Sequence, residues 1–259
     1  MKILHTSDWH LGAMLGPQKR YGEFDQALDW LIGVLEREKI EAVIISGDVF
    51  DSNLPSNRAT EQYYDFLVRA RAAGVRKLIV TAGNHDSASF LDAPGELLKH
   101  FSVHVAGHID TENTDSAVIP LEDPAGKIEA VVCAVPYLRD CDIRRAVAGE
   151  GIDEQEKRRL DGVLLWYRKV CARAVRSVPV KIFPAENGFR SLFLLRWDSV
   201  PWLEKKSVST LCFLMKVSEL LIQPLLSWLC RRFHLCSAVK VKLSVSFLMS
   251  GALPKIFLQ

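Results

Sequence analysis

The first hundred residues alternate between two hydrophobic patterns. Continuous apolar runs that close in polar residues are typical of buried strands, and they cover residues 2–8, 41–48, 76–86 and 102–107. The segments between them favour helices, over residues 21–39, 56–74 and 87–100. Ser56 can cap the second of these helices and Gly74 can end it. This alternation predicts a parallel sheet covered by helices.

The pattern changes beyond residue 110. Alternation over residues 116–138 predicts a hairpin that turns at Asp123–Gly126. Residues 153–178 repeat apolar positions at the helical period, which predicts one long amphipathic helix. The hairpin would make the sheet mixed and add a second layer. The predicted fold class is therefore α/β, with layered mixed β-sheets flanked by helices.

Polar residues with metal-binding chemistry follow the first three predicted strands, in the strings SDWH, SGDVFD and AGNHD. In open α/β folds the ligand site lies beyond the carboxyl ends of the strands. We therefore expect these residues to converge on one patch: Asp8, His10, Asp48, Asp51, Asn84, His85 and Asp86.

The residue types indicate what such a patch binds. Carboxylate, imidazole and amide oxygen together suit Mn²⁺, Fe²⁺ or Zn²⁺, whereas purely carboxylate sites suit Mg²⁺ or Ca²⁺. Two metals about 3.5–4 Å apart can clamp a phosphate and activate water. A histidine beside the metals, such as His85, can stabilise or protonate a leaving group. Gly47 and Gly83 would let the backbone turn sharply beneath the ligands.

Each motif alone has a simpler explanation, because a single DxH or GD is most often a cap or a turn. The ordered combination DxH, GDxxD and GNHD, each closing an apolar strand, indicates a metal site. Asp51 and Asp86 are expected to orient the loops around the metals. Four other histidines lie off the strand ends and receive no role: His5, His100, His104 and His108.

These three motifs resemble the signature of the calcineurin-like metallophosphoesterases. The longer strings MKILHTSDWHLG, SGDVFDSNLPS, TAGNHDSASFL and CAVPYLRDCDIRRAVAGE are similar to the SbcD-type bacterial nuclease subunits of that superfamily. The resemblance extends over residues 1 to about 178. It implies a metal-dependent hydrolase with the corresponding layered fold.

The resemblance also implies roles for single residues. Asp8 and His10 would hold the first metal, Asp48 would bridge both metals, Asn84 would hold the second, and His85 would serve the transition state. The implied metal is Mn²⁺, two ions per site, with Mg²⁺ as a substitute. The implied activity is hydrolysis of DNA phosphodiester bonds, at duplex ends as an exonuclease and at single strands and hairpins as an endonuclease. The implied partners are DNA, an SbcC-like ATPase subunit and a second copy of the chain, acting in DNA repair, recombination and replication.

The sequence departs from this family after Val178. The family completes its site with three further histidines, from a G-H and a G-H-x-H motif, but here only His234 follows Val178 and it stands in neither motif. Composition changes too: residues 1–178 carry 22 basic, 27 acidic and 13 glycine residues, and residues 179–259 carry 11, 4 and 2. We expect a nuclease domain over residues 1–178 that is incomplete at its C-terminal end, and an atypical, poorly folded tail over residues 179–259.

Two explanations of the tail remain open. A shift of reading frame near residue 178 would account for the lost motifs and the lost acidic residues together. A divergent basic domain that contacts DNA is the alternative. In either case each metal would lose imidazole ligands, so we expect weak or absent activity. A small-molecule phosphoesterase, or a non-catalytic subunit that binds SbcC or DNA, also remains possible from the sequence.

Composition also indicates the cellular compartment in which the protein is expected. The net charge of +2 does not by itself predict a nucleic-acid partner. The six cysteines form no CxxC pair, which favours reduced thiols and a cytoplasmic protein. The first residues lack the apolar stretch of a signal peptide. The apolar segment at residues 208–230 is interrupted by Lys216, Glu219 and Pro224, which argues against a membrane span.

Overall fold

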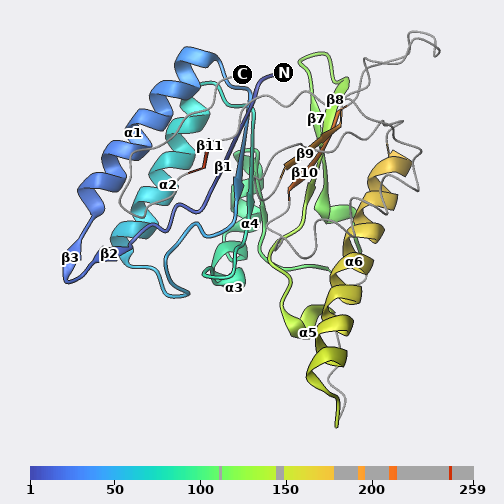
Figure 1. Cartoon of the computed structure of the whole chain (residues 1–259). Coiled ribbons are helices and arrows are strands. Elements are labelled where there is room, and N and C mark those ends of the chain that lie inside the picture. Colours follow the sequence, from blue (N-terminus) through green and yellow to red (C-terminus); the bar gives the residue numbers. More distant parts are fainter. Residues whose placement is uncertain (111–112, 144–148, 178–191, 196–209, 215–244, 247–259) are drawn as a thin grey trace. The chain divides into compact units, whose positions relative to one another are not determined.

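The computed structural model describes residues 1–110, 113–143, 149–177, 192–195, 210–214 and 245–246 (Figure 1). The chain divides into two compact units. The first comprises Met1–His108 and Lys242–Gln259, and the second comprises Ile109–Val241.

The first unit is built on a five-stranded sheet in the order β11-β1-β4-β5-β6. All four strand pairings are parallel, which confirms the parallel sheet predicted from the sequence. The strands are β1 (Ile3–Ser7), β4 (Ala42–Ser46), β5 (Lys77–Thr81), β6 (Val103–Ala106) and β11 (Val245–Ser246). Every residue of β4 is buried, as expected for a central strand of a covered sheet.

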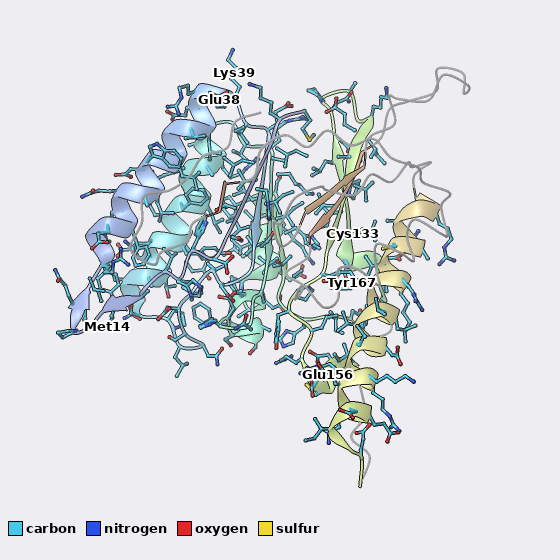
Figure 2. All side chains as sticks on the ribbon, in the orientation of Figure 1. Met14, Glu38, Lys39, Cys133, Glu156 and Tyr167 are labelled. Atoms are coloured by element: carbon cyan, nitrogen blue, oxygen red, sulfur yellow. The ribbon has the colours of Figure 1, made fainter. Side chains whose placement is uncertain are left out.

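Helices connect the strands of this sheet and pack against it. They are α1 (Tyr21–Glu38), α2 (Asn57–Ala72), α3 (Ala88–Asp92) and α4 (Gly95–His100). The apolar stripe of α1 is buried, from Phe24 to Leu35, and it belongs to one hydrophobic core with Leu4 and Phe66. A short antiparallel hairpin, β2 (Met14–Leu15) with β3 (Gln18–Lys19), was not predicted. Met14 lies exposed on this hairpin (Figure 2).

The ends of α2 show how local sequence sets its bounds. The Ser56 side chain accepts a hydrogen bond from the amide of Ala59 at 3.2 Å, which satisfies one of the unpaired amides of the first turn. The helix ends at Ala72, two residues before Gly74, whose φ of 96° few other residues adopt. Two arginines on α2 pair with acids on α1, Arg58 with Asp25 and Arg69 with Asp29.

The second unit contains a mixed four-stranded sheet in the order β7-β8-β10-β9. β7 (Val118–Glu122) and β8 (Ile128–Ala134) form the predicted antiparallel hairpin, while β10 (Thr210–Leu214) is parallel to β8 and antiparallel to β9 (Leu192–Leu195). The turn forms because the Asp123 side chain accepts from the amides of Ala125 and Lys127. The mixed sheet that the sequence predicted is thus present.

Two helices accompany this sheet, α5 (Asp140–Ile143) and α6 (Ile152–Ser177). α6 is the predicted long amphipathic helix and packs against β7 and β8. Tyr167 on α6 is buried close to Cys133 of β8 (Figure 2), and burial raises the pKa of the Tyr167 hydroxyl. A short 3₁₀ turn, η1 (Asp115–Ala117), precedes β7, and Arg173 of α6 pairs with Asp115.

The division expected at residue 178 stays a prediction, since most of residues 179–259 lie outside the described part of the chain. The same holds for the tail's expected poor folding. Among the described residues, no helix is both long and apolar enough to cross a membrane. The segment at residues 208–230 is mostly not described.

Candidate metal centre

The loops after β1 and β4 run side by side beyond the sheet. The Asp8 amide donates to the Gly47 carbonyl at 3.1 Å, and the His10 amide donates to the Asp48 carbonyl at 2.9 Å. The Gly47 amide donates in turn to the Thr81 carbonyl of β5 at 3.0 Å. Backbone hydrogen bonds therefore continue between the chain segments beyond the carboxyl ends of β1, β4 and β5. This is where an α/β fold places its ligand site.

Three candidate ligands have a left-handed backbone. The φ angles of Asp8, His10 and Asp48 are 57°, 49° and 48°. Aspartate and histidine tolerate this conformation better than most residues, yet it still costs on the order of 1–3 kcal/mol. Such strain persists only where the surrounding structure imposes it, and it clusters at functional sites. The backbone hydrogen bonds between the two loops supply that constraint.

The side chains of these residues converge. Asp8, His10 and Asp48 each offer a ligand atom, and the three atoms lie within 4.8 Å of one another. The Nε2 atom of His10 lies 3.8 Å from Oδ2 of Asp48, and the Asp48 residue is only 2% exposed. Two carboxylates beside one imidazole form a donor set that suits a divalent cation.

A second group shares His10. His10, Asp51 and His85 also offer ligand atoms within 4.8 Å of one another. Nδ1 of His10 lies 3.3 Å from Oδ1 of Asp51, and the rings of His10 and His85 meet edge to face with centroids 4.9 Å apart. Sequence reasoning assigned Asp51 only an orienting role, whereas the geometry also places its carboxylate among possible ligands.

Asp48 is held against the end of β5. Its Oδ1 accepts a hydrogen bond from the His85 amide at 3.1 Å. A Cβ atom at Gly83 would lie 2.0 Å from this oxygen and 2.2 Å from the Asp48 amide nitrogen. Only glycine allows the two loops to approach this closely, so Gly83 serves packing. Of the two glycines predicted to turn the backbone, Gly47 has a positive φ, of 75°, and Gly83 does not.

Asn84 and His85 follow Gly83 and are both exposed. Nδ1 of His85 lies 3.1 Å from the Asp51 carbonyl oxygen. Since a carbonyl only accepts, Nδ1 carries the hydrogen in this contact, and Nε2 is then the ring atom that can accept or transfer a proton. Asn84 lies in the sequence between Gly83 and His85, which both approach Asp48, and its predicted role as a ligand stays a prediction.

The buried side chain of Asp86 contacts both the loop after β4 and the turn after β5. It is 7% exposed, and its carboxylate accepts from the amides of Val49, Phe50 and Gly83 at 3.2, 2.9 and 2.7 Å. Burial raises the pKa of this carboxyl group, against the lowering effect of the three amides. Asp86 therefore ties the loop after β4 to the turn after β5.

Sequence reasoning missed Asn53. The side-chain amide of Asn53 is oriented so that its nitrogen faces acceptors. This nitrogen donates to the carbonyl oxygens of His85 and Asp86 at 2.8 and 3.1 Å. An asparagine in a polar loop gives no distinctive signal, so only the fold reveals this contact. The tryptophan of the first motif belongs to the core instead, where Trp9 is buried and donates to the Thr6 hydroxyl at 2.9 Å.

Two histidines that received no role have structural partners. His5 is buried with Nε2 2.7 Å from the Ser46 hydroxyl. Burial lowers the pKa of His5 to about 4, against a smaller opposing effect of Asp8. His108 pairs with Asp92 through Nδ1 at 2.6 Å. Neither belongs to the two groups of possible ligands found among the described residues.

Comparison with known proteins gives one family. The family model described as calcineurin-like phosphoesterase matches residues 1–212. Proteins named as the D subunit of the nuclease SbcCD are 39% identical over 148 residues in Rhodobacter capsulatus and 37% identical over 160 residues in Escherichia coli K12. The relative of the same name in Bacillus subtilis 168 is 37% identical over 132 residues.

These matches cover a larger share of this chain than of its relatives. They include 55%, 60% and 51% of this chain, but only 36%, 38% and 32% of the three relatives. The chain therefore spans less than two-fifths of the length of the curated relatives it matches.

Proposed function

The chain belongs to the calcineurin-like phosphoesterase family, and from this premise we propose that it is an SbcD-type nuclease subunit that hydrolyses DNA phosphodiester bonds. One observation carries the proposal: Asp8, His10 and Asp48 present ligand atoms within 4.8 Å of one another at the ends of neighbouring parallel strands. The similarity to proteins named as nuclease subunits supports DNA as the substrate.

Members of this family use divalent metals, and the two groups of donors are of the kind that holds them. We assign Asp8 and His10 to a first ion, Asp48 to a position between two ions, and Asn84 to the second. The proposed ions are Mn²⁺, with Mg²⁺ as a substitute. Bound there, they would polarise the phosphate and make water a nucleophile at neutral pH.

His85 is the proposed proton donor to the leaving oxygen. Its backbone amide is bound to Asp48 and its ring Nδ1 to the Asp51 carbonyl, so both its backbone and its ring are held in place. Nε2 is then available to a substrate oxygen, as general acid catalysis requires. We assign Asp51 and Asp86 to orienting these groups, Asp86 through its three backbone amides.

The wider assignment follows the named relatives. We propose exonuclease action on duplex ends and endonuclease action on single strands and hairpins, in DNA repair, recombination and replication. The naming of the relatives as subunits of SbcCD supports an SbcC-like ATPase partner. We also propose a homodimer within that complex and a cytoplasmic location.

We further propose that this chain is impaired. The family's G-H and G-H-x-H motifs, which supply three further histidines, are missing from this sequence after Val178. Without these imidazoles each metal would have fewer ligands, and both affinity and geometry would suffer. A shifted reading frame near residue 178 remains our preferred explanation, with a divergent basic domain as the alternative.

A cleavage assay with labelled hairpin DNA and Mn²⁺ tests the function. We expect slow cleavage that Asp48→Asn lowers by at least about 100-fold, the upper range for losing a metal-site partner. Asp65→Asn, on the exposed face of α2, is the matched control and should leave the rate unchanged. Calorimetric titration with Mn²⁺ reports metal binding separately from cleavage.

The other outcomes are informative. Hydrolysis of a generic phosphomonoester but not of hairpin DNA would indicate a small-molecule phosphoesterase. Binding of DNA or of an SbcC-like ATPase without any cleavage would indicate a non-catalytic subunit. Cleavage at the rate of an intact nuclease of this type would contradict the proposed impairment. Resequencing from codon 170, with translation in three frames, tests the shifted frame.

A further inference from the structure

The loop between Asp51 and α2 presents an unusual side chain. Leu54 is 89% exposed, the most exposed of the large hydrophobic residues in the described part of the chain. It lies three residues after Asp51, which belongs to one of the two groups of possible ligands. Three residues span at most about 10 Å. Leu54 is therefore an apolar side chain at the rim of the candidate metal centre.

This loop is held from several sides. The Asp51 carbonyl is bound by the His85 ring at 3.1 Å, and Asn53 donates to the carbonyl oxygens of His85 and Asp86. The Ser52 hydroxyl donates to the Leu54 carbonyl at 3.2 Å. These contacts fix the backbone on the N-terminal side of Leu54.

The C-terminal side is held as well. Pro55 restricts both its own φ and the conformation of Leu54. Ser56 then caps α2 through the Ala59 amide and contacts the Tyr21 hydroxyl at 2.8 Å. The contacts of this loop thus position a side chain that itself packs against little protein.

Leu97 and Val68 are exposed apolar residues that lack this connection. Leu97 on α4 is 63% exposed and Val68 on α2 is 64% exposed, but both lie on regular helices away from the strand ends. Single exposed apolar residues of this kind are ordinary. Leu54 differs because its loop is hydrogen-bonded to the residues that form the candidate centre.

We propose that Leu54 is an apolar wedge that packs against the terminal base pair of a DNA duplex and separates its strands. This inference rests on the proposed nuclease function. Proteins that unstack DNA insert leucine, isoleucine or phenylalanine between base steps. Because Leu54 lies at most about 10 Å along the backbone from Asp51, a phosphodiester held at the centre would bring its bases close to this side chain. The wedge would admit one strand to the centre while holding its complement aside.

Binding to DNA that carries 2-aminopurine at the terminal base pair tests the wedge without requiring cleavage. The full chain with Mn²⁺ should raise the fluorescence of the duplex as the terminal base unstacks. Leu54→Ala should lose most of this rise and bind the duplex on the order of tenfold more weakly, which corresponds to about 1.4 kcal/mol. Leu54→Met should retain the rise, since methionine keeps the apolar volume.

Two controls isolate the wedge from general effects. Leu97→Ala removes an equally large exposed side chain and should behave as the parent. Binding of a single strand of the same sequence should change by less than about twofold in Leu54→Ala, as for an ordinary surface substitution. Thermal unfolding of each variant, followed by circular dichroism, checks that the fold is retained.

The failures of the two proposals differ. If the parent binds the duplex and Leu54→Ala gives the same fluorescence rise, the wedge is wrong and the nuclease proposal stands. If the parent binds no DNA in any form, both are wrong. If Leu54→Ala instead dissociates a dimer in light scattering while base unstacking persists, Leu54 is a contact between copies and the wedge is overturned.

Discussion

The two units use unusual backbone conformations differently. In the first unit, the left-handed residues include Asp8, His10 and Asp48, which all bear candidate ligand atoms. In the described part of the second unit, the left-handed residues are the glycines Gly126 and Gly149, where the conformation has little cost. The first unit therefore holds strain where chemistry is expected, and the second uses glycine where only a turn is needed.

Their buried titratable groups differ in the same way. His5 of the first unit is buried beside Ser46, and burial lowers its pKa to about 4. Cys171 of the second unit is buried on α6, and burial raises the pKa of its thiol. Acid therefore acts on His5 of the first unit and alkali on Cys171 of the second, while burial also raises the pKa of Tyr63 in the first unit.

The largest expected effect is a loss of stability in the first unit, from a substitution where Gly83 packs against Asp48. Gly83→Ala would drive a Cβ atom into the Asp48 carboxylate and amide. We expect a loss of about 3–5 kcal/mol in the free energy of unfolding, as for severe overpacking, together with loss of Mn²⁺ binding. Urea denaturation and calorimetric titration measure the two effects.

Gly33→Ala is the matched control for this change. Gly33 lies within α1, and nothing is within 4 Å of a Cβ atom placed there. Alanine should raise stability by about 0.5–1 kcal/mol and leave metal binding unchanged. A Gly83→Ala protein as stable as the parent would show that the loops can separate without cost.

The next effect concerns acid. Since the pKa of His5 is about 4 in the fold and 6.5 in the unfolded chain, its neutral form favours the folded state above pH 6.5. This stability, about 3 kcal/mol, is lost as the pH falls from 6.5 to 4. His5→Gln cannot take up a proton, so it should flatten the stability curve in this window. An unchanged slope in urea denaturation would contradict the assignment.

Alkali should act on the second unit in the opposite direction. Because the folded pKa of Cys171 is raised, its contribution is complete below the unfolded pKa of the thiol and declines as the pH rises above it. Cys171→Ala should reduce this dependence, with the part due to the buried Tyr167 hydroxyl remaining, and leave the acid response of His5 intact. Denaturation curves at several alkaline pH values measure it; equal slopes in parent and variant would argue against the buried thiol.

The smallest effect sharpens the distinction between strain and function. Lys39 directly follows α1 and caps it, with a φ of 53°; Figure 2 shows it at that end of the helix. Asp8 has a similar φ of 57°. Lys39→Gly should stabilise the protein by about 0.5–1 kcal/mol because glycine adopts this conformation freely. Asp8→Gly should relieve similar strain but weaken the binding of Mn²⁺. Equal metal affinity in both variants would remove Asp8 from the ligands.

The sequence predicted the layout of the first unit because hydrophobic period and parallel topology are local properties. Continuous apolar runs identified β1, β4, β5 and β6, and parallel pairing then brings their carboxyl ends together. The convergence of Asp8, His10 and Asp48 follows from that geometry. Their roles as metal ligands, with that of Asn84, stay predictions.

Other features depended on contacts that no local pattern contains. The close approach of Gly83 to Asp48, the Asn53 amide on the loop carbonyls and the place of Asp51 beside His10 are set by how two loops pack. The β2–β3 hairpin has only two residues in each strand, too few to show alternation. β11 consists of two residues, Val245–Ser246, within the segment that the sequence predicted to be an atypical tail.

The hydrogen bonds from Asp8 to Gly47 and from Gly47 to Thr81 have a consequence for synthesis. They join three strands that all precede residue 82. At roughly 5–20 residues per second, a ribosome makes the first 86 residues in about 4–17 s, and these pairings need nothing that is translated later. A reading frame lost downstream would therefore leave these backbone pairings, and the residues that they bring together, intact in the nascent chain.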